Sequence, residues 1–194
     1  MAGARKTFNT PGDAHELTFS CYRRIPQFER EPLVSLFLSS LDQARDACKF
    51  HLWAFVVMPD HVHLLIWPTE PVYRMDRILT AIKKPASHLC LSWLREHDER
   101  ALARLRVSEK GGKARHRFWQ DGPGYDRNLF ASPAVWSSIS YMHANPVRKG
   151  LVGSELDCPW SSARWYADRE DWVLRVDSCP LERPKRIPDY RRDY

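Results

Sequence analysis

The chain has 194 residues, a length typical of one domain, and its 43% hydrophobic and 28% charged residues exclude a disordered chain. Its longest apolar runs, at 54–58 and 62–67, are far too short to span a bilayer, and no apolar segment follows the basic N-terminus, so we expect neither a membrane span nor a secretory signal. Five scattered cysteines without a C-x-x-C pair favour free thiols and a cytoplasmic location, and the net charge of +6 suits a polyanionic partner.

The first half of the chain alternates strand and helix signals. Residues 17–22 read as a strand, and a helix begins at Pro32, because apolar residues recur at helical spacing as far as Cys48. Two apolar runs, 52–57 and 62–67, flank a short Met-Pro-Asp connection, which predicts a β-hairpin. A second helix is expected over 72–84, where Pro85 ends or kinks it, and helical periodicity resumes over 86–105.

The second half begins with a Gly-containing loop at 108–114, a short strand-like segment at 115–120 and a turn at 121–124. Residues 125–130 follow as a strand or an extended approach to a helix. Ser132 and Pro133 favour a helix start, with Ser132 as N-cap, and Pro146 predicts its end near Asn145. This mixed order predicts an α+β fold with one antiparallel sheet and helices packed on one face.

The sharpest local pattern is Pro59-Asp60-His61-Val62-His63. Side chains two apart on a strand point to the same face, so His61 and His63 project together at a separation suited to one shared metal ion. Two histidines on a polar strand face are the alternative interpretation. The carboxylates of Asp60 and Asp126 could orient a histidine, although a turn residue and a solvated carboxylate are the simpler interpretations.

A second pattern is Tyr141-Met142-His143-Ala144-Asn145-Pro146-Val147. Tyr141 and Asn145 are four residues apart and therefore share one helix face, where the Asn145 side-chain oxygen is free to bind a cation. A core tyrosine with a satisfied hydroxyl and an asparagine C-cap are the alternatives. His143 points to a different helix face, which indicates a structural role.

Together these runs resemble a known family. The segments 57–65 and 118–120, the run from Tyr141 to Val152, and Trp160-Ser161-Ser162-Ala163 are similar, in the same order, to the single-tyrosine HUH transposases of insertion sequences. Within that class they resemble most the REP-associated tyrosine transposases. The resemblance covers residues 8–166, which predicts a transposase domain over 1–166 and a basic, Pro-rich C-terminal tail over 167–194.

The resemblance implies a ferredoxin-like fold and an enzyme that cuts and rejoins single-stranded DNA next to a hairpin. It implies that Tyr141 is the nucleophile and that Asn145 joins His61 and His63 as a metal ligand. A phosphate that fills the open positions of Mg²⁺ or Mn²⁺ would be polarised for attack, which would leave a 5′-phosphotyrosine and a free 3′-hydroxyl. A phenol ionises near pH 10, so the nucleophile needs positive charge nearby.

The expected partner is therefore single-stranded or hairpin DNA, bound by a monomer or a homodimer. Basic residues that bracket the catalytic segments are candidate phosphate contacts: Lys83, Lys84, Arg115, Arg117, Arg127, Arg148 and Lys149. A solvated surface charge is the alternative for each of them. Two rival functions remain at this point: a domesticated hairpin-binding protein that does not cleave DNA, and a small metalloenzyme unrelated to DNA.

Overall fold

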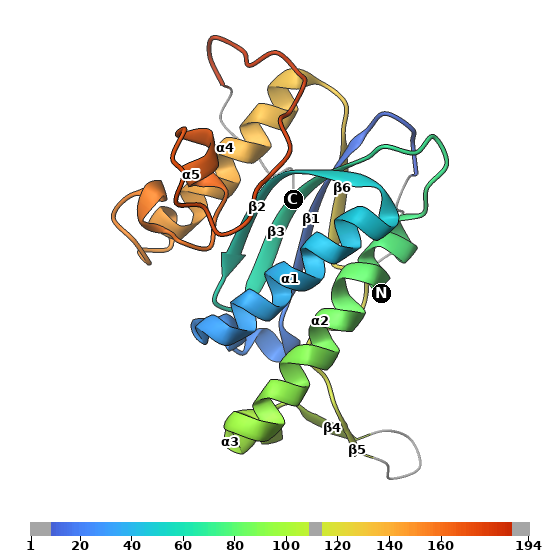
Figure 1. The fold of residues 1–194 in the computed structure, drawn as a ribbon, viewed down its shortest axis with the longest axis vertical. Helices are drawn as coiled ribbons and strands as arrows, with labels where there is room; N and C mark the ends of the chain where they lie inside the picture. The colour runs from blue at the N-terminus through green and yellow to red at the C-terminus, as the bar shows by residue number, and fades with distance from the viewer. Residues whose placement is uncertain (1–8, 109–113, 188–194) are drawn as a thin grey trace, which may run out of the picture.

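The computed structural model describes residues 9–108 and 114–187, and its centre is a four-stranded antiparallel sheet. Strands β1 (Ala14–Ser20), β2 (Phe50–Met58), β3 (His61–Pro68) and β6 (Tyr125–Leu129) are arranged in the order β2-β3-β1-β6. Helix α1 (Glu31–Cys48) follows β1 and helix α2 (Met75–His97) follows β3. The two helices lie side by side on one face of the sheet (Figure 1), which confirms the predicted ferredoxin-like α+β class.

Smaller elements surround this unit. Strands β4 (Arg106–Ser108) and β5 (Ala114–His116) form a separate antiparallel pair next to α3 (Glu99–Arg104), and residues 109–113 of the expected loop lie outside the described part of the chain. Helix α4 (Ser132–Arg148) and the short α5 (Ala163–Tyr166) follow β6. Within the described ranges, three single-turn 3₁₀ segments occur in the connections: Tyr22–Arg24, Gln27–Glu29 and Glu155–Asp157.

Strand alternation gives the sheet two different faces. Leu17, Phe19 and Leu64 point toward α1 and α2 and belong to the larger buried cluster. Leu65 and Val56 point the other way and pack with the apolar side of α4, in a second cluster. Helix α4 thus covers part of the face opposite α1 and α2, and residues at odd positions of β3 face it.

Two helices pass through prolines at which the sequence predicted an interruption. Helix α2 continues through Pro85, and α4 continues through Pro146 to Arg148. Proline removes one backbone donor but has a helical φ, so a helix fixed by tertiary packing can continue through it. The first helical residue of α4, Ser132, is not the predicted N-cap, because its hydroxyl donates to the backbone carbonyl of Glu182 instead.

The segment after α5 packs back onto the sheet. Val176 is buried, the Asp177 N–H donates to the Leu52 carbonyl at 2.8 Å, and the Leu52 N–H donates to the Asp177 carboxylate at 2.8 Å. The edge of β2 is therefore covered at this point rather than open to another strand. No helix among the described residues combines the length and the apolarity that crossing a bilayer requires.

Candidate metal and nucleophile site

The histidine pair lies on β3, an inner strand, and both rings face α4 as the i, i+2 spacing predicts. The Nε2 atoms of His61 and His63 are 3.1 Å apart, and their ring planes are inclined at 80°. Both side chains are largely buried: 12% of the His61 side chain and 2% of residue His63 are exposed. Two ring nitrogens therefore converge on one point in a sheltered position.

Each imidazole is held through its other nitrogen. His61 Nδ1 donates to the Asp60 carboxylate at 2.6 Å, and His63 Nδ1 is 2.8 Å from the Thr18 hydroxyl oxygen, which can accept a hydrogen bond from it. An Nδ1–H on each neutral ring leaves the Nε2 lone pair unprotonated. Burial opposes ionisation of the Asp60 carboxyl, but the hydrogen bonds from His61 and Arg24 and the positive charge of Arg24 outweigh it and lower its pKa. Asp60 therefore remains an anion that orients His61.

Asn145 supplies a third polar group at the same point. Its side-chain Nδ2 is 3.2 Å from His63 Nε2, and the residue is 6% exposed. A half-turn of the amide about its terminal bond brings the carbonyl oxygen to that position. Since the helix continues to Arg148, Asn145 belongs to the last full turn of α4 rather than to its end.

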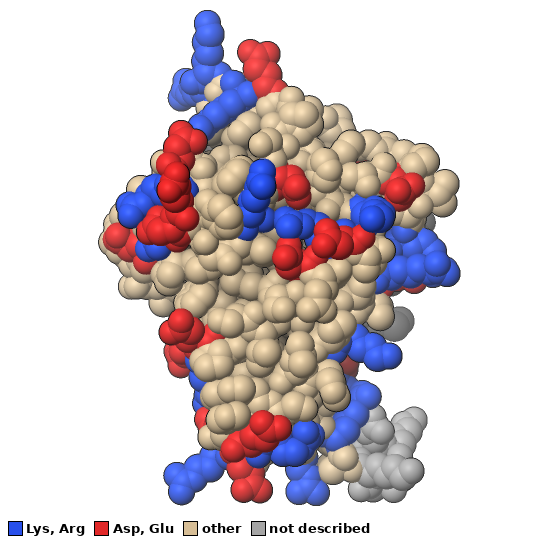
Figure 2. Space-filling view, in the orientation of Figure 1, with Lys and Arg blue, Asp and Glu red and all other residues tan. Residues whose placement is uncertain are grey.

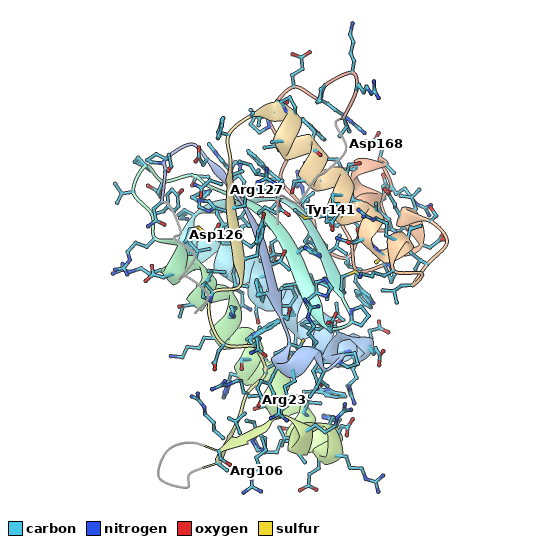
Figure 3. The ribbon with its side chains drawn as sticks, turned by 180° about the vertical axis from the view of Figure 1, so that it is seen from behind. Arg23, Arg106, Asp126, Arg127, Tyr141 and Asp168 are labelled. Atoms are coloured by element: carbon cyan, nitrogen blue, oxygen red, sulfur yellow. The ribbon has the colours of Figure 1, made fainter. Side chains whose placement is uncertain are left out.

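Tyr141 lies one turn before Asn145 on α4, and Figure 3 looks onto the face that carries it. The ring is half-buried, and the guanidinium carbon of Arg148 lies 4.8 Å from its centroid. Tyr141, Asn145 and Arg148 follow one another at spacings of four and three, so they form one stripe on the helix. A phenol and a guanidinium therefore lie on the same helix stripe as Asn145, the residue that contacts His63.

The sheet next to this cluster carries polar groups that the sequence analysis missed. Glu16 is fully buried on β1, and strand pairing sets it opposite Arg127 of β6, on the same face as Thr18 and His63. The alternation of polar and apolar residues in β1 could have indicated that Glu16 and Thr18 share a face. The pairing of Thr18 with His63 could not be found in this way, because it joins residues from distant parts of the chain. Asp126 does contact a histidine, but this histidine is His15, whose Nδ1 is 2.8 Å from the Asp126 carboxylate on the face of the sheet opposite His61 and His63.

The predicted phosphate contacts divide between the two faces of the sheet. Arg127, Arg148 and Lys149 lie on β6 or at the end of α4. Lys83, Lys84, Arg115 and Arg117 lie instead on or next to α2 and β5. The Lys83 ammonium donates to the Gly122 carbonyl at 2.9 Å, and Arg117 pairs with Asp121. The seven residues therefore do not form one continuous patch around the histidines.

The donor set fits a divalent metal ion. Within the described residues, no three His, Cys, Asp or Glu side chains converge as a metal site, so a third ligand from the protein must come from another residue type. Two imidazole nitrogens whose lone pairs meet at 3.1 Å repel each other unless a proton or a cation lies between them. With the Asn145 amide added, the set has two nitrogen donors and one oxygen donor and leaves coordination positions open.

A family of transposases matches the segment that carries the histidine pair. The model of the family described as "Transposase IS200 like" matches residues 14–122, a segment that contains both histidines and ends before α4. A solved structure of a REP-associated tyrosine transposase bound to a REP hairpin is similar in fold, with a TM-score of 0.68, 18% identity, 97% of this chain covered and 100% of that chain.

A candidate transposase from Deinococcus radiodurans matches less well, at a TM-score of 0.42 and 20% identity over 73% of this chain and 97% of that chain, and no curated protein matches. The family model spans more than half of the residues and includes the strand that carries the histidine pair. The chain therefore belongs to the IS200-like transposase family.

Proposed function

We propose that this protein is a metal-dependent endonuclease and strand transferase that cleaves and rejoins single-stranded DNA next to a hairpin, with Tyr141 as the nucleophile. The convergence of the His61, His63 and Asn145 donor atoms, one helical turn from Tyr141, carries the proposal. A binding protein without cleavage activity does not need these groups together. We assign the reaction to residues 1–166 and treat 167–194 as an accessory tail.

His61 Nε2, His63 Nε2 and the Asn145 amide oxygen would hold Mg²⁺ or Mn²⁺, and the imidazole donors favour Mn²⁺. The bound ion would neutralise phosphate charge and polarise the phosphorus. The Asp60 carboxylate, which only accepts, keeps His61 in the tautomer that presents Nε2, and the Thr18 hydroxyl can accept from His63 in the same way. The low exposure of His63 and Asn145 excludes most water from this point, which strengthens their interaction with an anionic phosphate.

Tyr141 would attack the phosphorus of a DNA phosphodiester through its phenol oxygen. A bond forms between that oxygen and phosphorus, the bond from phosphorus to the 3′-oxygen breaks, and the phenol proton passes to solvent while the 3′-hydroxyl gains one. The product is a 5′-phosphotyrosine, which conserves bond energy for rejoining, so no nucleotide is needed. Arg148, beside the Tyr141 ring, supplies positive charge for the phenolate.

The hairpin substrate rests on two lines of support. The fold resembles that of a protein described in complex with a REP hairpin. In this chain, Arg127, Arg148 and Lys149 are on the elements that border the histidine cluster, where they can contact phosphates on either side of the reacting bond.

The direct test is a covalent trapping experiment. Labelled single-stranded hairpin DNA with unpaired flanks is incubated with the full chain and Mn²⁺ and then run on a denaturing gel, and a shifted band is expected. The band should disappear with a chelator and with Tyr141→Phe, which removes one oxygen and almost no packing. A Tyr141→Phe protein that still forms the adduct would exclude Tyr141 as nucleophile, and hairpin binding without any adduct in the wild type would favour a domesticated binding protein.

A further inference from the structure

Two consecutive arginines in the turn after β1 have a strained backbone conformation. Arg23 and Arg24 have φ values of +54° and +52°, in the left-handed region that L side chains rarely adopt. Such residues cost free energy and persist only where the surrounding structure fixes them. Since β1 pairs Ser20 with His61, the turn lies at the end of the sheet where β3 begins, and Figure 3 shows Arg23 at that end.

Backbone hydrogen bonds tie this turn to the connection between β2 and β3. The Cys21 N–H donates to the Asp60 carbonyl at 2.8 Å, just before the turn. The Phe28 N–H donates to the Pro59 carbonyl at 2.9 Å, just after it. The segment between these two donors is therefore fixed at both ends to the connection that precedes the histidine pair.

The strained turn directs the Arg24 side chain at the carboxylate that orients His61. Arg24 Nη1 donates to Asp60 Oδ2 at 3.0 Å, while Asp60 Oδ1 accepts from His61 Nδ1 at 2.6 Å. One carboxylate oxygen thus serves the guanidinium, and the other serves the imidazole. The carboxylate therefore cannot rotate about the bond to its side chain without breaking one of the two contacts.

Arg23 has the charge and the left-handed φ of Arg24 but makes a different contact. Its guanidinium carbon lies over the Tyr22 ring, 5.1 Å from the centroid. The chain has 30 Lys and Arg residues, and on the face that carries α1 and α2 many of them lie beside Asp or Glu side chains (Figure 2). Charge alone therefore does not single out one arginine, whereas the contact with Asp60 does.

The exposure of the Arg24 ion pair indicates a role in orientation rather than in stability. The Arg24 side chain is 67% exposed and that of Asp60 is 23% exposed. Water and salt screen an exposed ion pair, so its contribution to folding is small. The strength of the pair therefore does not offset the strain of the turn, and strain of this kind gathers at functional sites.

We propose that Arg24 is a positioning residue of the reaction: it fixes the Asp60 carboxylate, which in turn fixes His61 with Nε2 directed at the metal ion. The inference rests on the proposed function and deepens it, because it adds a residue behind Asp60 and distinguishes between two arginines of one turn. Arg24 acts here through Asp60 and does not touch the metal, so its removal should weaken metal binding without abolishing it.

The test compares Arg24→Gln with Arg23→Gln, which remove the same charge from the same turn and leave its strained backbone unchanged. Mn²⁺ is titrated into the full metal-free chain, and the electron paramagnetic resonance of the free ion gives the affinity. Loss of a group behind a metal ligand typically lowers metal affinity by about 10- to 100-fold. We expect a loss of about tenfold for Arg24→Gln, because it acts through Asp60, and wild-type affinity for Arg23→Gln.

A second comparison asks whether the effect passes through Asp60. In an Asp60→Asn protein, the further change Arg24→Gln should lower the Mn²⁺ affinity no further, because both changes act on one chain of contacts. Equal affinities of the two arginine variants, both folded by circular dichroism, would overturn the proposal, as would a full additional loss in the Asp60→Asn protein.

His61→Ala separates this proposal from the metal site on which it rests. It should abolish Mn²⁺ binding at the site, because it removes a ligand. If His61→Ala binds Mn²⁺ like the wild type, the proposed metal site itself is wrong. If His61→Ala loses Mn²⁺ while the two arginine variants bind equally, the metal site stands and only the role of Arg24 is excluded.

Discussion

At the scale of single residues, the orientation of the two imidazoles depends on one carboxylate and one hydroxyl. Asp60 precedes His61 in the chain, so its position follows from the tight connection between β2 and β3. Thr18 reaches His63 only because β1 pairs with β3 in a register that sets these two residues opposite each other. The Thr18 hydroxyl is therefore the more informative of the two groups to remove.

Thr18→Val should weaken metal binding while the protein stays folded. Valine keeps the shape of the side chain but cannot accept from His63 Nδ1, and removal of a hydrogen bond behind a metal ligand typically lowers metal affinity by about 10- to 100-fold. Titration with Mn²⁺, followed by the electron paramagnetic resonance of the free ion, measures the affinity. Thr80→Val, on the exposed side of α2, is the control. Equal Mn²⁺ affinities in the two variants would show that Thr18 does not orient the ligand.

At the scale of elements, helix α4 is fixed against the sheet by a buried polar contact. His143 Nε2 is 2.8 Å from the Ser162 hydroxyl, and that hydroxyl also bridges the Phe55 backbone N–H and carbonyl of β2. His143 is 5% exposed and lies on a different side of α4 from Tyr141 and Asn145. The contact therefore determines how α4 presents those two residues to the histidine pair.

Protonation of His143 should weaken this docking in acid. Burial lowers the pKa of His143 from 6.5 to about 4. Between these two pH values the unfolded chain therefore binds the proton more readily than the folded chain. The contribution of neutral His143 to the free energy of unfolding is complete above about pH 6.5 and is lost as pH falls toward 4, by about 3 kcal/mol in total. Denaturant unfolding at several pH values measures it. His143→Gln should flatten the slope in this window, and an unchanged slope would contradict the assignment.

The turn before β6 is a second determinant at this scale. Gly124 has a φ of +89°, and a Cβ there would overlap the Thr18 carbonyl oxygen, whereas Gly122, with a φ of +90°, has open space around it. Gly122→Ala should therefore cost about 1 kcal/mol through backbone strain alone. Gly124→Ala should cost about 3 kcal/mol or more, because the Thr18 backbone must also move. Chemical denaturation of the two variants compares them directly, and equal losses of stability would mean that the close approach to Thr18 is unimportant.

Local patterns predicted much of this arrangement. The strand period paired His61 with His63, and the helix period aligned Tyr141 with Asn145. The contact between Asn145 and His63 is a tertiary contact that no local period determines, and so is the one between Thr18 and His63. The helix end expected near Asn145 was wrong, and α2 continues through Pro85, where an end or a kink was expected, because packing of both helices against the sheet outweighs the local preference.

At the scale of the whole molecule, the sheet divides the basic residues into two groups. The sequence analysis grouped seven basic residues as phosphate contacts because they bracket the catalytic segments in the chain. The fold separates this set. Four of its members lie on the α2 side and three on the α4 side: Lys83, Lys84, Arg115 and Arg117, and Arg127, Arg148 and Lys149. The sequence alone does not show which face of the sheet carries a given basic residue, because this depends on how the strands pair. The chain has a net charge of +6, and its two groups of basic residues can contact DNA independently, each with its own dependence on salt.

The salt dependence of hairpin binding should identify the charges on the α4 side. Each neutralised phosphate releases counterions, so the slope of log affinity against log salt falls by about 0.9 for each duplex phosphate that the protein no longer neutralises. Arg148→Gln/Lys149→Gln should therefore reduce the slope for a blunt hairpin by nearly 2, and affinity should fall most at low salt. Lys49→Asn, at the end of α1, changes the net charge without touching this face and should leave the slope intact. Anisotropy titrations between about 50 and about 200 mM salt measure the slopes. If the double variant and the control give the same slope, Arg148 and Lys149 are solvated surface charges, and the phosphates next to the histidine site must be held by other groups.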